Sequence, residues 1–210
     1  MKYRYIMWDW NGTLLDDVGA SLHAVNDMLK KYGKSEIGYD EYYSYIDTPI
    51  YKFYERIFDF NVVPMDILKS LFADYYRKYE NTIKLADGAE GLLKECKDNG
   101  VKQYIVSAAH IDDISRYTKM YGIYDIFERI EGARDYDAGS KIEGAKRLMN
   151  EEGIRGEECV FIGDTLHDEQ TAKELGIECI LYSEGHTDHA RLKKTGRIVC
   201  SSFEDIRKMI

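Results

Sequence analysis

The sequence contains little proline, no long apolar run and no excess of positive charge. Only 2 of its 210 residues are proline and 44% are hydrophobic, so the composition suits a folded chain with a buried core. No stretch has the apolar length of a membrane helix, and residues 1–4 lack the apolar character of a secretory segment. We therefore expect a cytoplasmic protein with no membrane partner.

Basic residues are outnumbered by acidic ones. The chain has 29 lysines and arginines against 38 aspartates and glutamates, for a formal net charge of -9. A surface of this sign repels the phosphates of nucleic acids and of anionic lipids, so we expect no nucleic acid partner. An anionic small molecule would need a metal ion and a few well-placed cationic side chains to create a local positive site.

Cysteine is also sparse, and no two cysteines have the spacing of a metal-binding pair. Three of the four lie in apolar runs typical of strands. We therefore expect buried free thiols in place of disulfides or zinc ligands. The four are Cys96, Cys159, Cys179 and Cys200.

Two different patterns divide the chain. Residues 3–10 have the pattern of a short buried strand that ends in a polar turn. Residues 16–85 instead carry apolar residues at helical spacing, are interrupted by Pro49 and Pro64, and show no convincing strand. They predict an insert of about four helices.

From residue 86 onward, apolar strands alternate with helices, and this alternation predicts an α/β fold with a parallel sheet covered on both faces. The expected strands are 101–107, 130–133, 159–162, 178–181 and 198–200, and the expected helices are 88–97, 111–121, 142–151 and 167–175. Asp9, Ser107 and Asp164 each follow or end such a strand. Ligands bind beyond the carboxyl ends of parallel strands, so these three residues should meet at one rim.

Two short motifs carry most of the candidate chemistry. The first is Asp9-Trp10-Asn11-Gly12-Thr13-Leu14, and the second contains Asp164 and Asp168 directly after the strand 159–162. Each has an ordinary structural explanation, since aspartate closes turns and caps helices. Capping accounts for one member of the acidic pair more readily than for both.

Together these stretches resemble the haloacid dehalogenase-like (HAD) superfamily, whose first motif is Asp-x-Asp-x-Thr and whose last is Gly-Asp followed by another Asp. The resemblance covers nearly the whole chain in order and is greatest to the phosphoglycolate phosphatase-like branch. It implies a Rossmann-like core of residues 1–15 and 86–210, with residues 16–85 as an inserted α-helical cap. It also implies a phosphatase acting on a small phosphorylated metabolite, as a monomer or small homo-oligomer.

The resemblance makes Asp9 the nucleophile that forms an aspartyl-phosphate. Two anions must then meet, and a divalent cation offsets their repulsion; oxygen ligands suit Mg²⁺. The implied metal ligands are an Asp9 oxygen, the backbone carbonyl of Asn11, and Asp164, with Asp168 binding directly or through water.

The remaining motifs imply contacts with phosphate. Ser107 matches the second motif, where its hydroxyl and the backbone N–H groups around Ala108 would hold phosphate oxygens. Lys141, in Gly139-Ser140-Lys141, matches the third motif and would neutralise developing charge and restrain Asp9. The family often has proline at the next position, where this chain has Ile142. Gly12 and Thr13 of the first motif, and Lys52 of the insert, complete the expected substrate contacts.

Asn11 departs from the family pattern, because most phosphatases of this family have a second aspartate there. That aspartate protonates the leaving group and later activates water, and its loss typically costs ~10²–10⁴ in rate. Three explanations stay open. The substrate has a good leaving group, with water or a cap residue supplying the acid. The chain instead runs another reaction of the superfamily, such as phosphonoacetaldehyde-type hydrolysis with Lys52 as a Schiff-base lysine. Or it binds phosphoesters with impaired turnover. The fit of Ser107, Lys141 and the acidic pair to a phosphate site favours a phosphatase.

Several other polar and aromatic residues have simpler interpretations. Ten of the 18 tyrosines fall between residues 32 and 79, where packing explains most of them without an aromatic pocket. Asp16 and Asp17 are expected to end the first loop and enter a hinge. The histidines are expected to be surface or hydrogen-bonded side chains, none of them a metal ligand, and those considered are His110, His167, His186 and His189.

Overall fold

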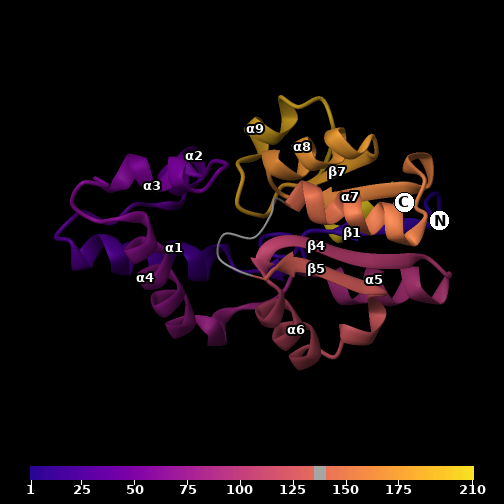
Figure 1. Ribbon diagram of the computed structural model, residues 1–210, viewed down its shortest axis with the longest axis horizontal. Coiled ribbons are helices and arrows are strands. Elements are labelled where there is room, and N and C mark those ends of the chain that lie inside the picture. Colours follow the sequence, from indigo (N-terminus) through magenta and orange to yellow (C-terminus); the bar gives the residue numbers. More distant parts are fainter. Residues whose placement is uncertain (135–140) are drawn as a thin grey trace.

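The computed structural model describes residues 1–134 and 141–210, and its centre is a six-stranded parallel sheet (Figure 1). The strand order is β5-β4-β1-β6-β7-β8, with every neighbouring pair parallel. The predicted α/β fold with a parallel-sheet core is confirmed. The strands are β1 (Tyr5–Trp8), β4 (Lys102–His110), β5 (Arg129–Ala133), β6 (Cys159–Gly163), β7 (Glu178–Tyr182) and β8 (Ile198–Cys200).

Side chains of each strand alternate between two hydrophobic cores, one on each face of the sheet. In β1, Ile6 and Trp8 enter one core and Met7 enters the other. Figure 1 shows α5 and α6 on one side of the sheet and α7, α8 and α9 on the opposite side. The first core is covered by α5 (Ala89–Asp98), α6 (Ile111–Met120) and α10 (Phe203–Arg207), and the second by α7 (Lys141–Glu152), α8 (Leu166–Leu175) and α9 (His189–Lys193).

The register of the central strands fixes which residues emerge together at the carboxyl rim. Trp8 pairs with Ile105 of β4 and with Ile162 of β6. The next residue, Asp9, donates its backbone N–H to the Ile162 carbonyl at 2.8 Å. Asp164 directly follows the end of β6, so the first and last motifs leave adjacent strands at the same level.

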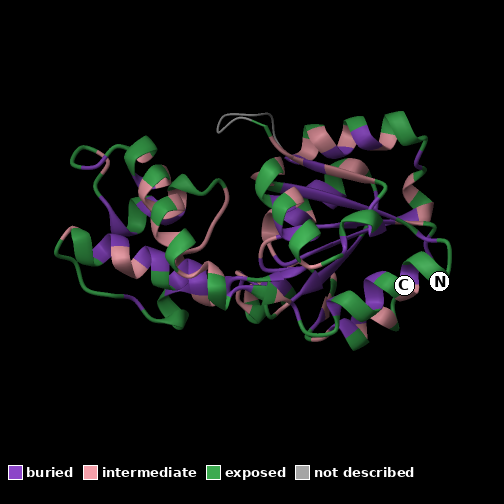
Figure 2. Cartoon of the chain, turned by 90° about the horizontal axis from the view of Figure 1, so that it is seen from below, coloured by how far each residue is buried: buried purple, intermediate pink, exposed green. Residues whose placement is uncertain are grey.

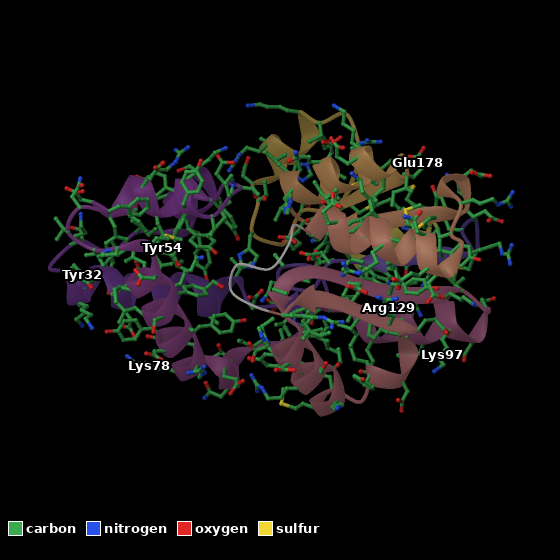
Figure 3. All side chains as sticks on the ribbon, viewed as in Figure 1. Tyr32, Tyr54, Lys78, Lys97, Arg129 and Glu178 are labelled. Atoms are coloured by element: carbon green, nitrogen blue, oxygen red, sulfur yellow. The ribbon has the colours of Figure 1, made fainter. Side chains whose placement is uncertain are left out.

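Four α-helices between β2 and β3 form a separate unit, here called the helical insert. They are α1 (Val18–Lys31), α2 (Tyr39–Tyr45), α3 (Tyr51–Ile57) and α4 (Met65–Lys78). The insert has its own hydrophobic core, which includes Leu22, Met28, Phe53 and Leu68. Figure 2 shows it beside the sheet, and the insert lies at the opposite end from both chain termini. Figure 3 shows Tyr32 and Tyr54 among its side chains, and Tyr54 is buried in that core.

The structure differs from the sequence prediction mainly in short elements. Residues 16–85 were expected to contain no strand, but β2 (Leu15–Asp16) and β3 (Lys84–Leu85) pair in antiparallel fashion where the chain enters and leaves the insert. Two-residue strands are too short to show an alternating pattern, and the five-residue helices α9 and α10 are too short to show a helical one. The remaining short helices are η1 (Glu80–Thr82), η2 (Tyr124–Ile126) and η3 (Gly156–Glu158).

Two further expectations concern the cysteines and the membrane. All four cysteines are free and buried, as predicted. Within residues 1–134 and 141–210, no helix combines the length and the apolar character needed to cross a membrane.

Candidate active site

Three buried aspartates meet at the carboxyl rim of the sheet. Asp9 follows β1, Asp164 follows β6, and Asp168 lies in the first turn of α8. One carboxylate oxygen from each lies within 4.8 Å of the other two, and Asp164 and Asp168 have no exposed surface. Like charges at this separation in a buried site repel strongly, so the cluster needs positive charge.

Lys141 supplies part of that charge. Its Nζ lies 2.5 Å from Asp9 Oδ1 and 2.5 Å from Asp168 Oδ1, and its side chain is only 3% exposed. Burial alone would lower the pKa of this lysine, but the charges of Asp168 and Asp9 raise it on balance, so the ammonium stays charged. Although it is the first residue of α7, Lys141 is thus buried and paired. Its motif neighbours Gly139 and Ser140 lie outside the described residues.

Asp168 also stabilises the start of α8. Thr165 is the N-cap of α8, and its hydroxyl accepts a hydrogen bond from the Asp168 N–H. Asp168 Oδ2 in turn accepts from Asp164 N at 3.1 Å, Thr165 N at 2.8 Å and Thr165 Oγ1 at 2.7 Å. This reciprocal arrangement is a capping box. Helix capping therefore accounts for Asp168 but not for Asp164, whose side chain is bound elsewhere.

Asp164 is held by two segments distant in sequence. Thr13 Oγ1 donates to Asp164 Oδ1 at 2.8 Å, and His186 N donates to Asp164 Oδ2 at 2.6 Å. Burial, together with the charges of Asp9 and Asp168, raises the pKa of Asp164 to about 8, although His186 opposes the rise. Burial likewise raises the pKa of Asp9, against the attraction of Lys141. If all three carboxylates were ionised, they would carry more negative charge than Lys141 offsets, and the raised pKa values of Asp9 and Asp164 reflect this.

This donor set fits a hard divalent cation. Its available atoms are carboxylate oxygens, which suit Mg²⁺ or Ca²⁺ better than softer metals. Among residues 1–134 and 141–210, Asp9, Asp164 and Asp168 are the only such group of three. A bound cation would let all three carboxylates ionise together, which gives a physical reason for a cation to bind there.

The first loop uses its own donors to position these carboxylates. Thr13 is fully buried, and its hydroxyl is committed to Asp164. Gly12 N donates to Asp17 Oδ1 at 2.8 Å, and lies 2.9 Å from the Leu15 carbonyl. Both residues were expected to contact substrate, and in this structure their donors face protein oxygens.

Ser107 and Ala108 lie within β4, not after it. This strand continues to His110, with a shift of register against β5 after Val106. Ser107 is buried, and its Oγ accepts from Ala109 N at 3.2 Å, whereas Ala108 is exposed. His110 caps α6 by accepting from Asp112 N. The strand was expected to end at Ser107, and the irregular pairing extends it by three residues.

Lys52 is not joined to the carboxylate cluster. It is the second residue of α3 in the helical insert and is half-buried. Within the described parts of the chain, its side chain makes no hydrogen bond or ion pair.

The structure adds a second buried group that the sequence did not reveal. Asp17, only 2% exposed, accepts from Asn11 Nδ2 at 2.7 Å and from the Tyr76 hydroxyl at 2.8 Å. His186 Nε2 lies 3.1 Å from Asp17 Oδ1, and its Nδ1 lies 2.9 Å from the Tyr42 hydroxyl. His186 therefore links the helical insert to the first loop.

Opposing effects set the charges of this group. Burial would raise the pKa of Asp17, but the charge of His186 and hydrogen bonds from His186, Asn11 and Tyr76 lower it on balance. Burial would lower the pKa of His186, but Asp17 raises it to about 9 through its charge and hydrogen bond. Asp17 and His186 thus form a partly buried ion pair at neutral pH.

Part of this group could have been found from the sequence. His186 lies in the loop after β7, and β7 neighbours β6, so its carboxyl end faces the same rim as Asp164. The rule that loops after parallel strands build the site covers His186 as well. No spacing rule brings Tyr42 and Tyr76 of the insert to this rim.

Gly12 offers a test of how closely the two loops approach. It has φ 71°, and a Cβ there would collide with Asp164 Oδ2 and the His186 ring. Gly33 has φ 66° but no atom within 4 Å of such a Cβ. We expect Gly33→Ala to lower the free energy of unfolding by ~1–2 kcal/mol, the cost of the left-handed conformation alone.

Gly12→Ala should lower it by a further ~1–3 kcal/mol, because the loops must move apart. Urea denaturation of both variants measures the difference. Equal losses would show that the loops around Gly12 are not closely packed.

Comparison with known proteins finds a family model and relatives that are similar to this chain. The family model described as haloacid dehalogenase-like hydrolase matches residues 6–182. A 5'-nucleotidase from Pseudomonas aeruginosa is 23% identical over all of this chain and 96% of its own length. Phosphoglycolate phosphatase 1 from the same organism is 24% identical over 90% of this chain and 72% of its own length.

Among solved structures, a haloacid dehalogenase-like hydrolase from Streptococcus pneumoniae superposes with a TM-score of 0.80 at 19% identity. The match covers 100% of this chain and 99% of that one. This likeness concerns the fold, whereas the family model spans most of the sequence, including the first and last motifs. The chain therefore belongs to the haloacid dehalogenase-like hydrolase family.

Proposed function

We propose that this chain is a Mg²⁺-dependent phosphatase that hydrolyses a small phosphomonoester through an aspartyl-phosphate on Asp9. The observation that carries the proposal is the cluster of Asp9, Asp164 and Asp168 with Lys141 between two of them. A carboxylate nucleophile beside a cation site and a buried ammonium suits attack on a phosphate ester.

The proposed reaction has two steps. An Asp9 carboxylate oxygen attacks phosphorus, the bond from phosphorus to the ester oxygen breaks, and the leaving oxygen takes up a proton from water. Water then attacks the aspartyl-phosphate at phosphorus, releasing inorganic phosphate and restoring Asp9. Lys141 holds Asp9 in place and offsets charge on the transferring group, and the Ser107 hydroxyl with the N–H groups near Ala108 would bind phosphate oxygens.

Asp9, Asp164, the Asn11 backbone carbonyl and, through water, Asp168 would hold Mg²⁺, which offsets repulsion between Asp9 and the phosphate. A water-mediated role suits Asp168, because its oxygens already bind Lys141 and the start of α8. Asn11 cannot donate the proton that the leaving oxygen needs. With substrates that have poor leaving groups, turnover is therefore expected to be ~10²–10⁴ times slower than with an aspartate acting as the acid at this position.

The relatives named above act, by their names, on phosphoglycolate and on 5'-nucleotides. We propose a substrate of the same class, a small phosphorylated metabolite. The helical insert, residues 16–85, is proposed to act as the cap over the site, since His186 and Arg191 both contact it. Arg191 of α9 donates to the carbonyls of Tyr43 at 3.0 Å and Ile46 at 2.7 Å.

Metal dependence is the first test. We expect phosphate release from a panel of sugar, nucleotide and carboxylic-acid phosphates to need Mg²⁺ and to stop with EDTA. Mg²⁺ should also raise the thermal unfolding midpoint, because a cation bound only to the native cluster stabilises it. Asp164→Asn should abolish both effects.

Asp98→Asn, which changes an exposed carboxylate at the end of α5, serves as the control and should behave as the wild type. Release that persists in EDTA, or an Asp164→Asn variant as active as the wild type, would contradict the proposed function.

A further inference from the structure

The carboxylate of Asp17 does not cap the backbone of its own helix. Asp17 is the N-cap residue of α1, a position where aspartate normally accepts from the helix's free N–H groups. Here the side chain makes no such hydrogen bond. It instead faces the first loop, where Oδ1 accepts from Gly12 N at 2.8 Å and Oδ2 from Asn11 Nδ2 at 2.7 Å.

The contact between residues 11 and 17 fixes which of them can be charged. An amide nitrogen donates to a carboxylate, but two carboxylates at this separation repel, and Asp17 is buried away from screening water. With an aspartate at position 11, the loop would carry two facing negative charges beside the cluster of three carboxylates. Asn11 and Asp17 therefore fit together only while one of them is neutral.

The other partners of Asp17 favour the charge at position 17. His186 pairs with Oδ1, and the Tyr76 hydroxyl of α4 donates to Oδ2 at 2.8 Å. Five donors thus converge on this carboxylate from the loop, the insert and the segment after β7, because the Ser21 hydroxyl of α1 also donates to Oδ2 at 3.5 Å. The Asn11 amide nitrogen also donates to the Tyr76 hydroxyl at 3.5 Å, so Tyr76 contacts both residues.

We propose that Asn11 and Asp17 form an exchanged pair, in which the one negative charge that this part of the loop can hold lies on residue 17 instead of residue 11. Asp17 is then a positioning residue that fixes the Asn11 side chain and the loop carrying Asp9. Asn11 is accordingly one half of a matched pair, and Asn11→Asp alone does not produce a better enzyme. The inference deepens the proposed function and depends on it only for the activity measurement.

The test is a double-mutant cycle with Asn11→Asp, Asp17→Asn and the double variant. Aspartate and asparagine have nearly the same shape, and the double variant keeps the net charge of the wild type. Urea denaturation in EDTA, without substrate, gives the unfolding equilibrium constant of each chain. We expect both single variants to be less stable, and the double variant to be more stable than the sum of the two changes by about tenfold or more in that constant.

A surface pair provides the matched control. Asn61 Nδ2 donates to Asp59 Oδ1 at 3.0 Å in an exposed turn, the same chemistry in water. The corresponding cycle with Asn61→Asp and Asp59→Asn should show coupling of less than about threefold, since solvent screens the charges. If Asp17 had a purely structural role, Asp17→Asn would change the unfolding equilibrium constant by the same factor in the wild type and in the Asn11→Asp variant.

Phosphate release with Mg²⁺ provides the second measurement. We expect Asn11→Asp alone to turn over no faster than the wild type. The double variant should exceed Asn11→Asp by about tenfold or more in kcat, because the amide introduced at position 17 then orients the carboxylate at position 11 in the reversed contact. Additive stabilities, or an Asn11→Asp variant that is both as stable as the wild type and faster, would overturn the exchanged pair. If no chain releases phosphate, the stability cycle still decides the pair and only the proposed function fails.

Discussion

Replacing Asp9 with asparagine is expected to lower phosphate release by about 10⁴- to 10⁶-fold, the loss typical when a covalent nucleophile is removed. The amide keeps the shape of the side chain but cannot attack phosphorus. The variant should remain folded, because it removes one negative charge from a buried group in which three carboxylates share one lysine. Its unfolding midpoint in EDTA should therefore not fall below that of the wild type.

The covalent step can be examined separately from turnover. Hydroxylamine converts an acyl phosphate into a hydroxamate, and peptide mass spectrometry after incubation with substrate should find this product at Asp9 of the wild type. The Asp9→Asn variant serves as the blank. Wild-type release without modification at Asp9, or a variant with normal release, would remove Asp9 from the nucleophile role while leaving the family assignment intact.

Replacing Lys141 with methionine is expected to lower the free energy of unfolding by ~3–5 kcal/mol, the usual cost of removing one partner from a buried ion pair. Methionine keeps an apolar side chain of similar length but removes the ammonium, which lies 5.1 Å from the centre of the Phe161 ring and between Asp9 and Asp168. Phosphate release should also fall by ~10²–10³, since a charge placed to stabilise the transition state is lost.

Lys146→Met is the matched control on the same helix. Lys146 is 43% exposed and pairs with Glu143 at 3.6 Å in solvent, so its loss should change stability by less than ~0.5 kcal/mol. Mg²⁺ should stabilise the Lys141→Met variant more than the wild type, because a cation can replace part of the missing charge. Equal stability of the two lysine variants would mean that Lys141 does not balance the cluster.

Much of the fold and of the carboxylate cluster followed from patterns that are local in sequence. The alternating strands and helices after residue 86 predicted the parallel sheet, because burial on both faces demands apolar runs. Asp9 and Asp164 could be paired because parallel strands bring their carboxyl ends to the same rim. The identity of Asp168 as a capping residue was also open to prediction, since Thr165 precedes it by three positions.

By itself, the sequence determined the family, the sheet and the acidic motifs, since each depends on periodicity or on residues a few positions apart. Only the tertiary structure decided that Lys141 is buried between Asp9 and Asp168, and that Asp17 faces Asn11 instead of capping its own helix. These contacts join the rim to α7 and to the helical insert, and burial and charge are properties of the packed neighbours. A sequence pattern cannot give them, because the partners of one side chain are fixed only when separate segments fold against each other.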